Sequence, residues 1–312
     1  MRSPAAVATV FLLTSAFFWG TAFRATLIGA EHSPTMTFTA LRAAPAAIAL
    51  LIIALLVRSR LPRGQVLVWA SATGFLMITI ALAGLAESVT RAGAGNAAVV
   101  SNTVPFFVIL IAPLLLGEHA SRVGIGGLVL GFAGIVLMVS SQLGGVESTG
   151  EFLLGLVFAF ASATSWALGT VLVKRMMRER GQIDLVGFTA VQYVIGSLLL
   201  VLLAIAIDSP GETDWSSGEL WAAVAWVSLG SSVLATLAYF GALKRLPASR
   251  VAAWGFAAPV VAVLVEIGRG DVPQTIVLAG MILAIAGLGI TNAAPIRQAD
   301  PAIKPLRVTR AK

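Results

Sequence analysis

The chain has 312 residues, of which 58% are hydrophobic and only 11% are charged, and its formal net charge is +7. Soluble domains carry about 25% charged residues, so this composition excludes an ordinary cytosolic enzyme, a nucleic-acid-binding domain and a disordered protein. The absence of cysteine excludes a disulfide scaffold, a cysteine-ligated metal site and thiol catalysis. The two histidines, His32 and His119, add little to this set, and we expect no metal and no cofactor.

Ten apolar segments follow one another along the chain, and each is long enough to cross about 30 Å of hydrocarbon as a helix. Barrel strands would instead alternate over about ten residues. The sequence therefore predicts an all-α integral membrane protein with ten transmembrane helices and short connections. The predicted spans are 7–29, 34–57, 65–86, 92–116, 122–142, 152–173, 185–207, 219–242, 248–267 and 273–294. The third and fourth spans are separated by only a few residues around Glu87 and Arg91.

The distribution of basic residues predicts the orientation of these spans. With the N-terminus inside, most of the 21 Lys and Arg residues fall in cytoplasmic segments, and only Arg91 and Arg269 fall in outer ones. An excess of Lys and Arg on the cytoplasmic side is typical of membrane proteins. We therefore expect a multi-pass protein of the plasma membrane or the bacterial inner membrane, with both termini in the cytoplasm.

The second five spans repeat features of the first five in the same order. The matched positions are Trp19 and Trp166, Arg42 and Gln192, Pro105 and Pro259, and the glycine-rich stretches 127–134 and 280–287. Because five is odd, the two halves would cross the membrane in opposite directions, as in transporters that open a central cavity to each side in turn. The alternative is a duplication that only enlarges the bundle. The expected units are the repeats 1–146 and 147–294 and a basic cytoplasmic tail, 295–312.

Several short motifs carry a resemblance to a known family. They are Trp19-Gly20 in the first span, Ser33-Pro34 and Arg42 in the second, Pro105 and Leu116-Gly117-Glu118 in the fourth, and the glycines of the fifth. In these motifs the chain resembles the drug/metabolite transporter superfamily, in particular its ten-helix EamA-type members. The resemblance implies two five-helix repeats around a central cavity and movement of small metabolites or drugs, often outward. The ninth span departs from the pattern, because it ends in Arg269-Gly270-Asp271 where the fourth ends in Leu-Gly-Glu.

Arg42 is the first candidate for a binding residue. It lies about 12 Å along the helix axis from Pro34, within the outer half of the bilayer, where a charge is costly unless it faces a cavity or a partner. Its planar guanidinium group would suit a substrate carboxylate or phosphate. The alternative is a structural arginine that caps carbonyl groups or pairs with an acid.

Other polar and aromatic residues within the spans are candidates for lining a cavity, the alternatives being interhelical hydrogen bonds and core packing. They are Trp19, Asn96, Asn102, Trp166, Gln192, Tyr193, Tyr239 and Trp254. Pro105 and Pro259 are candidate hinges, because a proline removes one helix hydrogen bond. Glu266 is a candidate proton carrier, since a carboxyl group in apolar surroundings can exchange protons near neutral pH. The alternatives for Glu266 are an ion pair with Arg269 and exposure at the outer mouth.

These observations predict a secondary active transporter that moves a small organic solute by alternating access. We expect export of an amino acid, a related metabolite or a drug. The expected partners are this solute and the lipid bilayer, with no nucleic acid, and we expect a monomer because both repeats lie in one chain. An intramembrane enzyme and a channel are the alternatives. A serine protease would need a histidine inside the membrane, whereas both histidines fall in loops, and no repeated filter or charged ring indicates a channel.

Overall fold

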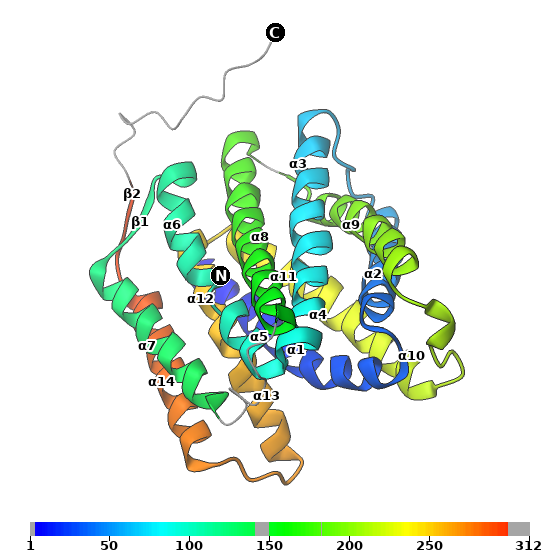
Figure 1. The fold of residues 1–312 in the computed structure, drawn as a ribbon. Coiled ribbons are helices and arrows are strands. Elements are labelled where there is room, and N and C mark those ends of the chain that lie inside the picture. Colours follow the sequence, from blue (N-terminus) through cyan, green and yellow to red (C-terminus); the bar gives the residue numbers. More distant parts are fainter. Residues whose placement is uncertain (1–3, 141–149, 182, 299–312) are drawn as a thin grey trace.

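The computed structural model describes residues 4–140, 150–181 and 183–298, and nearly all of them are helical (Figure 1). Within these ranges nine helices are long and apolar enough to cross a membrane, which confirms the expected class of all-α membrane protein. They are Ala5–His32, Thr35–Leu56, Gln65–Ala92, Ala94–Leu116, Gly150–Arg180, Leu185–Ile207, Gly218–Leu243, Ala248–Gly268 and Thr275–Ala293. The predicted span 122–142 matches a shorter apolar helix, Arg122–Met138, and its last two residues lie outside the described ranges. A tenth crossing therefore stays a prediction.

Five of the nine spans consist of one α-helix, and the other four are interrupted. The single helices are α1 (Pro4–His32), α2 (Thr35–Leu56), α8 (Gly150–Arg180), α9 (Leu185–Ile207) and α14 (Thr275–Ala293). The interrupted spans contain α3 (Gln65–Gly74) and α4 (Ala81–Ala92), α5 (Ala94–Ser101) and α6 (Val104–Leu116), α10 (Gly218–Ala225) and α11 (Ala235–Leu243), and α12 (Ala248–Ala253) and α13 (Ala257–Gly268). The shorter apolar helix is α7 (Arg122–Met138).

The interruptions occur at similar places in the two halves of the chain. A π-helical segment, Phe75–Ile80, joins α3 to α4, and another, Trp226–Leu234, joins α10 to α11. A short non-α turn separates α5 from α6, and a 3₁₀ turn, Trp254–Phe256, separates α12 from α13. Such departures from α-helical geometry are frequent at functional sites.

The predicted boundary between the third and fourth spans was wrong. Glu87 and Arg91 lie inside α4, not in a connection, and form an i, i+4 ion pair with 2.8 Å between Arg91 Nε and a Glu87 carboxylate oxygen. The helix continues to Ala92 and ends at Gly93, whose φ of +82° is readily adopted only by glycine. The sixth predicted span is also longer than expected, since α8 continues to Arg180.

Both candidate hinge prolines lie at the start of a helical segment. Pro105 is the second residue of α6, and Pro259 is the third residue of α13. In the first turn of a helix the backbone N–H groups have no intrahelical acceptor, so proline there removes no hydrogen bond. The break in each span therefore precedes the proline, and whether these breaks move stays a prediction.

Segments far apart in the sequence pack side by side. The helix α2 packs along α9, and α7 packs along α14; in Figure 1 the second pair lies at the lower left and the first at the right. Between these pairs, α8 packs against α4 and α6, and α1 packs against α11 and α13. The pairs α2–α9 and α7–α14 each join corresponding helices of the two halves. The contacts of α8 with α4 and α6 correspond to those of α1 with α11 and α13 when the two halves are exchanged.

Glycines form much of the contact between α7 and α14. A β-carbon on Gly287 would lie 2.3 Å from the backbone nitrogen of Gly131, and one on Gly134 would lie 2.5 Å from the backbone of Ala284. Small residues let membrane helices approach this closely. Next to this pair, the short strands β1 (Glu118–Ala120) and β2 (Ile296–Gln298) pair antiparallel.

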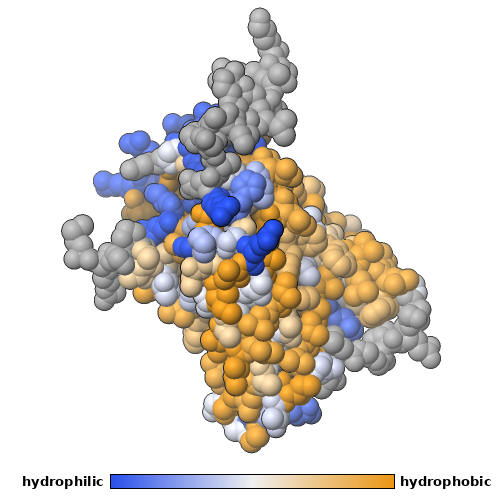
Figure 2. Space-filling view, turned by 90° about the vertical axis from the view of Figure 1, so that its left-hand side faces the viewer, coloured by the Kyte–Doolittle hydropathy of each residue, from blue (hydrophilic) through white to orange (hydrophobic). Residues whose placement is uncertain are grey.

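The surface of the bundle is largely apolar. Exposed large hydrophobic side chains lie on many helices, among them Ile48, Leu110, Ile205 and Ile282. Figure 2 shows one such face, broadly hydrophobic, with hydrophilic residues gathered mainly toward its upper part. Water would disfavour a surface of this kind, whereas lipid requires it.

Candidate functional site

Three aromatic residues from different helices meet inside the bundle. The rings of Trp19 (α1) and Trp166 (α8) lie edge to face with 5.7 Å between their centroids, and Tyr239 (α11) lies 5.2 Å from Trp19 and 6.1 Å from Trp166. The Tyr239 hydroxyl is within 3.2 Å of the Thr170 hydroxyl. Trp19 and Trp166 are partly exposed, whereas Tyr239 is buried. The sequence named all three as candidates, and the structure brings them together.

Ser231 joins this aromatic cluster to Arg42. The Trp19 indole N–H donates to the Ser231 carbonyl oxygen over 3.2 Å, and Arg42 Nη2 donates to the Ser231 hydroxyl over 3.1 Å. Ser228, one turn earlier, donates to the Arg42 carbonyl oxygen over 3.0 Å. Ser231 and Ser228 both lie in the π-helical segment Trp226–Leu234, so this irregular segment positions the arginine beside the aromatic rings.

The Arg42 guanidinium group keeps donors available for a ligand. It has one hydrogen bond, from Nη2, and its buried Nε has no partner among the described residues. No carboxylate pairs with it in the part of the chain that the structure describes. A buried polar nitrogen without a partner is costly, and in a binding site that cost favours an anionic ligand, because a guanidinium group binds carboxylate oxygens through several donors.

The repeat partners of Arg42 have different surroundings. Gln192 is 1% exposed and donates to the Thr73 hydroxyl over 2.7 Å. The hydroxyl of Tyr193, which is also buried, lies 3.1 Å from that of Thr236. Both side chains therefore use their polar groups in interhelical hydrogen bonds, which was the alternative to lining the cavity.

The remaining polar candidates make no hydrogen bond to the Arg42 side chain among the described residues. The side-chain amides of Asn96 and Asn102 each donate over 2.8 Å to the carbonyl oxygen four residues earlier, which belongs to the end of α4 for Asn96 and to α5 for Asn102. The indole N–H of Trp254 donates to the Asn292 side chain of α14 over 3.2 Å. These polar groups are therefore used in contacts with neighbouring helical segments.

Glu266 takes part in ion pairs near the C-terminal end of α13. Its carboxylate oxygens lie 3.5 Å from Arg24 Nη1 and 3.9 Å from Arg269 Nε, and its side chain is 38% exposed. The ion pair with Arg269 was the alternative to a proton carrier. A partly exposed side chain between two cations does not have the apolar surroundings on which the proton-carrier prediction rested.

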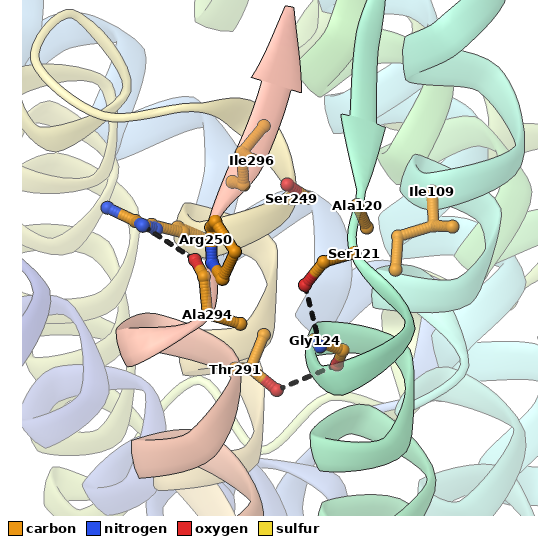
Figure 3. A pocket seen from close by; sticks show the side chains of 10 residues that line it. Ile109, Ala120, Ser121, Gly124, Ser249, Arg250, Thr291, Ala294 and Ile296 are labelled. Atoms are coloured by element: carbon orange, nitrogen blue, oxygen red, sulfur yellow. Dashed lines mark hydrogen bonds between the residues drawn. The ribbon is translucent and has the colours of Figure 1, made fainter.

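Two cavities among the described residues lie away from this cluster. One, of about 370 Å³, lies between α2, the third span, α8 and α9, and its lining includes the exposed apolar side chains Phe75 and Ile207, so it opens toward lipid. The other lies beside β1, α7, α12 and α14 and measures about 10 Å³, which is the space of one water molecule (Figure 3). Neither cavity is lined by Arg42 or the three aromatic residues. The candidate site is therefore identified by its polar and aromatic side chains and not by a cavity.

Sequence reasoning missed Ser231, Ser228 and the other hydroxyl residues that bind the candidates. The signal was present as three serines at positions 228, 231 and 232 within an apolar span. Their partners depend on helix packing and could not be read from the sequence. Among the residues that the structure describes, no group of three or more His, Asp or Glu side chains is placed to hold a metal ion.

Membrane-spanning helices packed around a polar and aromatic cluster place this chain in the class of polytopic membrane proteins. The sequence model of the EamA-like transporter family matches residues 6–140 and again residues 153–293. The chain belongs to this family, and the resemblance seen in its motifs is confirmed. The same family model thus matches each half of the chain once.

Individual relatives agree with this assignment. The chain is 26% identical over 277 residues to the uncharacterized transporter YvbV of Bacillus subtilis, covering 88% of each protein. It is 24% identical over 175 residues to the aromatic amino acid exporter YddG of Ancylobacter novellus, covering 56% of this chain and 58% of the exporter. A crystal structure with 22% sequence identity superposes with a TM-score of 0.77, covering 92% of this chain and 97% of the other, which shows a shared fold.

Proposed function

We propose that this protein is a secondary active transporter that exports a small organic solute by alternating access between its two five-helix repeats. The corresponding interruptions and helix contacts of the two halves support the repeat, as does the double match to one family model. Inverted repeats of this kind open a site near the bilayer midplane to either side. In this proposal the monomer is the transporting unit, the N- and C-termini lie in the cytoplasm, and the protein is not an enzyme.

The observation that carries the proposal is the cluster of Arg42, Ser231 and the three aromatic rings. A solute with a carboxylate could accept hydrogen bonds from the free donors of Arg42 while its apolar part packs against Trp19 and Trp166. Aromatic side chains offer a large apolar contact area with a polar edge. An amino acid or another small organic carboxylate fits this pattern, and one relative bears the name of an aromatic amino acid exporter.

Counterflow in proteoliposomes tests this proposal. Vesicles loaded with a mixture of amino acids and organic acids are diluted into labelled solute, and exchange identifies what the protein carries. Charge-assisted hydrogen bonds contribute about 1.5–3 kcal/mol, so Arg42→Gln should raise the carboxylate concentration needed for half-maximal exchange about ten- to a hundredfold. Arg42→Lys keeps the charge but loses the planar guanidinium group. Its half-maximal concentration should lie between those of the unmodified protein and Arg42→Gln.

A matched control separates binding from folding. Arg122 is exposed at the start of α7, so Arg122→Gln should leave exchange unchanged. Thermal unfolding in detergent is measured on the same preparations. Normal carboxylate exchange by a stable Arg42→Gln protein would remove Arg42 from the binding site, and loss of folding in both Arg42 variants would make it a structural residue.

A further inference from the structure

One end of the bundle holds a buried cluster of charges that the proposed binding site does not use. We call it the inner end; it carries the connections 57–64, 117–121, 181–184 and 244–247 and lies toward the top of Figure 1. Glu118, the first residue of β1 and two residues past the end of α6, is 2% exposed. One of its carboxylate oxygens accepts a hydrogen bond from Arg178 Nη2, and the other accepts one from the backbone N–H of Ala248 over 2.9 Å. The carboxylate therefore connects α6 to α8 and to the start of α12.

Two cations on α8 complete the cluster. Arg178 also donates from Nη1 to the carbonyl oxygen of Leu116 over 2.7 Å. One turn earlier, Lys174 is 8% exposed and donates to the carbonyl oxygens of Leu243 and, over 2.9 Å, Leu246. These carbonyl groups lie at the end of α11, where cations are favoured by the helix dipole.

The cluster therefore joins the two halves of the chain at one end. Glu118 belongs to the first half, whereas the N–H of Ala248 and both cations belong to the second. Separating α6 from α8 and α12 would break every hydrogen bond of the Glu118 carboxylate. Removing a buried charge from its partners is strongly unfavourable, so these contacts favour the closed arrangement of this end.

The corresponding positions at the outer end cannot form such a cluster. Glu118 corresponds to Asp271, and the spacing that aligns Trp19 with Trp166 aligns Leu27 with Lys174 and Glu31 with Arg178. The outer end therefore has two acids and a leucine at these positions and lacks both cations. Asp271 and Glu31 are also exposed.

Different ion pairs do join the two halves at the outer end, but they are exposed. Arg24 of α1 and Glu266 of α13 lie 3.5 Å apart with side chains 44% and 38% exposed, and Arg91 of α4 pairs with Glu151 of α8, whose side chain is 68% exposed. Exposed ion pairs contribute little, because water screens both charges. The two ends therefore differ in how firmly they are closed.

We propose that Glu118, Lys174 and Arg178 form a latch that keeps the inner end closed, and that the lack of an equivalent at the outer end makes the outward-open state the resting state. This inference rests on the alternating access of the proposed function. Each transport cycle must then break the latch before solute can enter from the cytoplasm. The latch residues are positioning residues, since they contact neither Arg42 nor the aromatic rings.

Distances between spin labels at the inner end test the latch without any transport assay. The chain has no cysteine, so Leu114→Cys and Arg180→Cys place two labels on exposed sites near the ends of α6 and α8, on either side of the Glu118–Arg178 contact. Pulsed electron resonance then gives the populations of short and long distances in the full chain. Adding Glu118→Gln should raise the ratio of the long to the short distance about tenfold, the effect of losing one charge-assisted hydrogen bond.

Matched variants make the result decisive. Glu179→Gln removes a partly exposed carboxylate on α8 that pairs with Arg175 through an i, i+4 contact of 2.7 Å, and should change nothing. Glu31→Arg puts a cation at the outer-end position that corresponds to Arg178, as Asp271 corresponds to Glu118, and should shift the distances at the inner end toward opening by stabilising a closed outer end. Arg178→Lys is a milder variant in case Glu118→Gln does not fold; it keeps the charge, and it should raise the ratio less than Glu118→Gln.

Two outcomes separate this inference from the proposed function. If Glu118→Gln and Arg178→Lys both give the distances of the Glu179→Gln control while counterflow persists, the latch is overturned and transport stands. If the latch variants shift the distances but no solute exchanges, the latch stands and the proposed function fails.

Discussion

The glycine contact between α7 and α14 gives a prediction whose size follows from the geometry. In Gly287→Ala the added methyl group would lie 2.3 Å from the Gly131 nitrogen and 2.5 Å from both the Gly127 carbonyl oxygen and the Gly131 Cα. Ordinary contacts of a β-carbon begin near 3.4 Å, and all three atoms belong to the backbone, so no side chain can rotate away. The helices must separate by about 1 Å, and overpacking of this kind costs about 1–3 kcal/mol.

The same helix supplies the control for this substitution. A β-carbon on Gly289 meets no atom within 4 Å, so Gly289→Ala adds a methyl group without a clash. Both substitutions gain the roughly 1 kcal/mol by which alanine is favoured over glycine in a helix, so the overpacking cost of about 1–3 kcal/mol alone separates the two variants in the free energy of unfolding. The midpoint of thermal unfolding in detergent should be several degrees lower for Gly287→Ala than for Gly289→Ala. Equal midpoints would refute the close contact between α7 and α14.

Two further predictions concern orientation and pH. Ser216 and Gln65 are both exposed and lie at opposite ends of the bundle. Cysteine at Ser216 should react with a membrane-impermeant thiol reagent added outside intact cells, whereas cysteine at Gln65 should react only after the membrane is opened. The reverse pattern would overturn the proposed topology. Although partial burial alone would raise the pKa of Asp184, its hydrogen bonds with Ser59 and with backbone N–H groups of residues 60, 186 and 187 outweigh this effect and hold the pKa below its ordinary value. A carboxylate with a lowered pKa stabilises the fold above about pH 4, and this stabilisation is lost as the pH falls through its folded-state pKa. Asp184→Asn should therefore lower the unfolding midpoint at pH 7 and make little difference near pH 3. An equal loss at both pH values would show that the charge of Asp184 is not involved.

The helices were predictable where their ends carry local signals. The predicted span 185–207 coincides with α9, because Asp184 caps its first turn and Asp208 follows its last residue. The end of α8 could not be predicted in this way, since Lys174 and Arg178 resemble the charges that end a span. They continue the helix because distant partners, Leu243 and Glu118, accept their hydrogen bonds.

The interruptions of the helices could not be predicted from the sequence, for a different reason. A π-helical segment depends on how neighbouring helices fit, and no residue type specifies it. Gly74, at the end of α3, shows this dependence, because a β-carbon there would lie 2.5 Å from the Gln192 carbonyl oxygen of α9. The sequence could indicate that Arg42 and Trp19 are candidates, but not that Ser231 would join them.

The comparison of Arg42 with Gln192 explains why a site between symmetric halves can bind an asymmetric solute. The two residues hold matching positions in the second and seventh predicted spans. Gln192 donates a hydrogen bond to Thr73, whereas the buried Nε of Arg42 has no partner among the described residues. At this matched position only the first half has a positive charge. The side chains of Arg42 and Trp19 both donate to Ser231 in the second half. The proposed site therefore has a charged side formed by α2 and the π-helical segment Trp226–Leu234, and an aromatic side formed by α1, α8 and α11. A solute with a carboxylate at one end and an apolar group at the other would bind such a site in one orientation, and it would keep that orientation whichever end of the bundle is open.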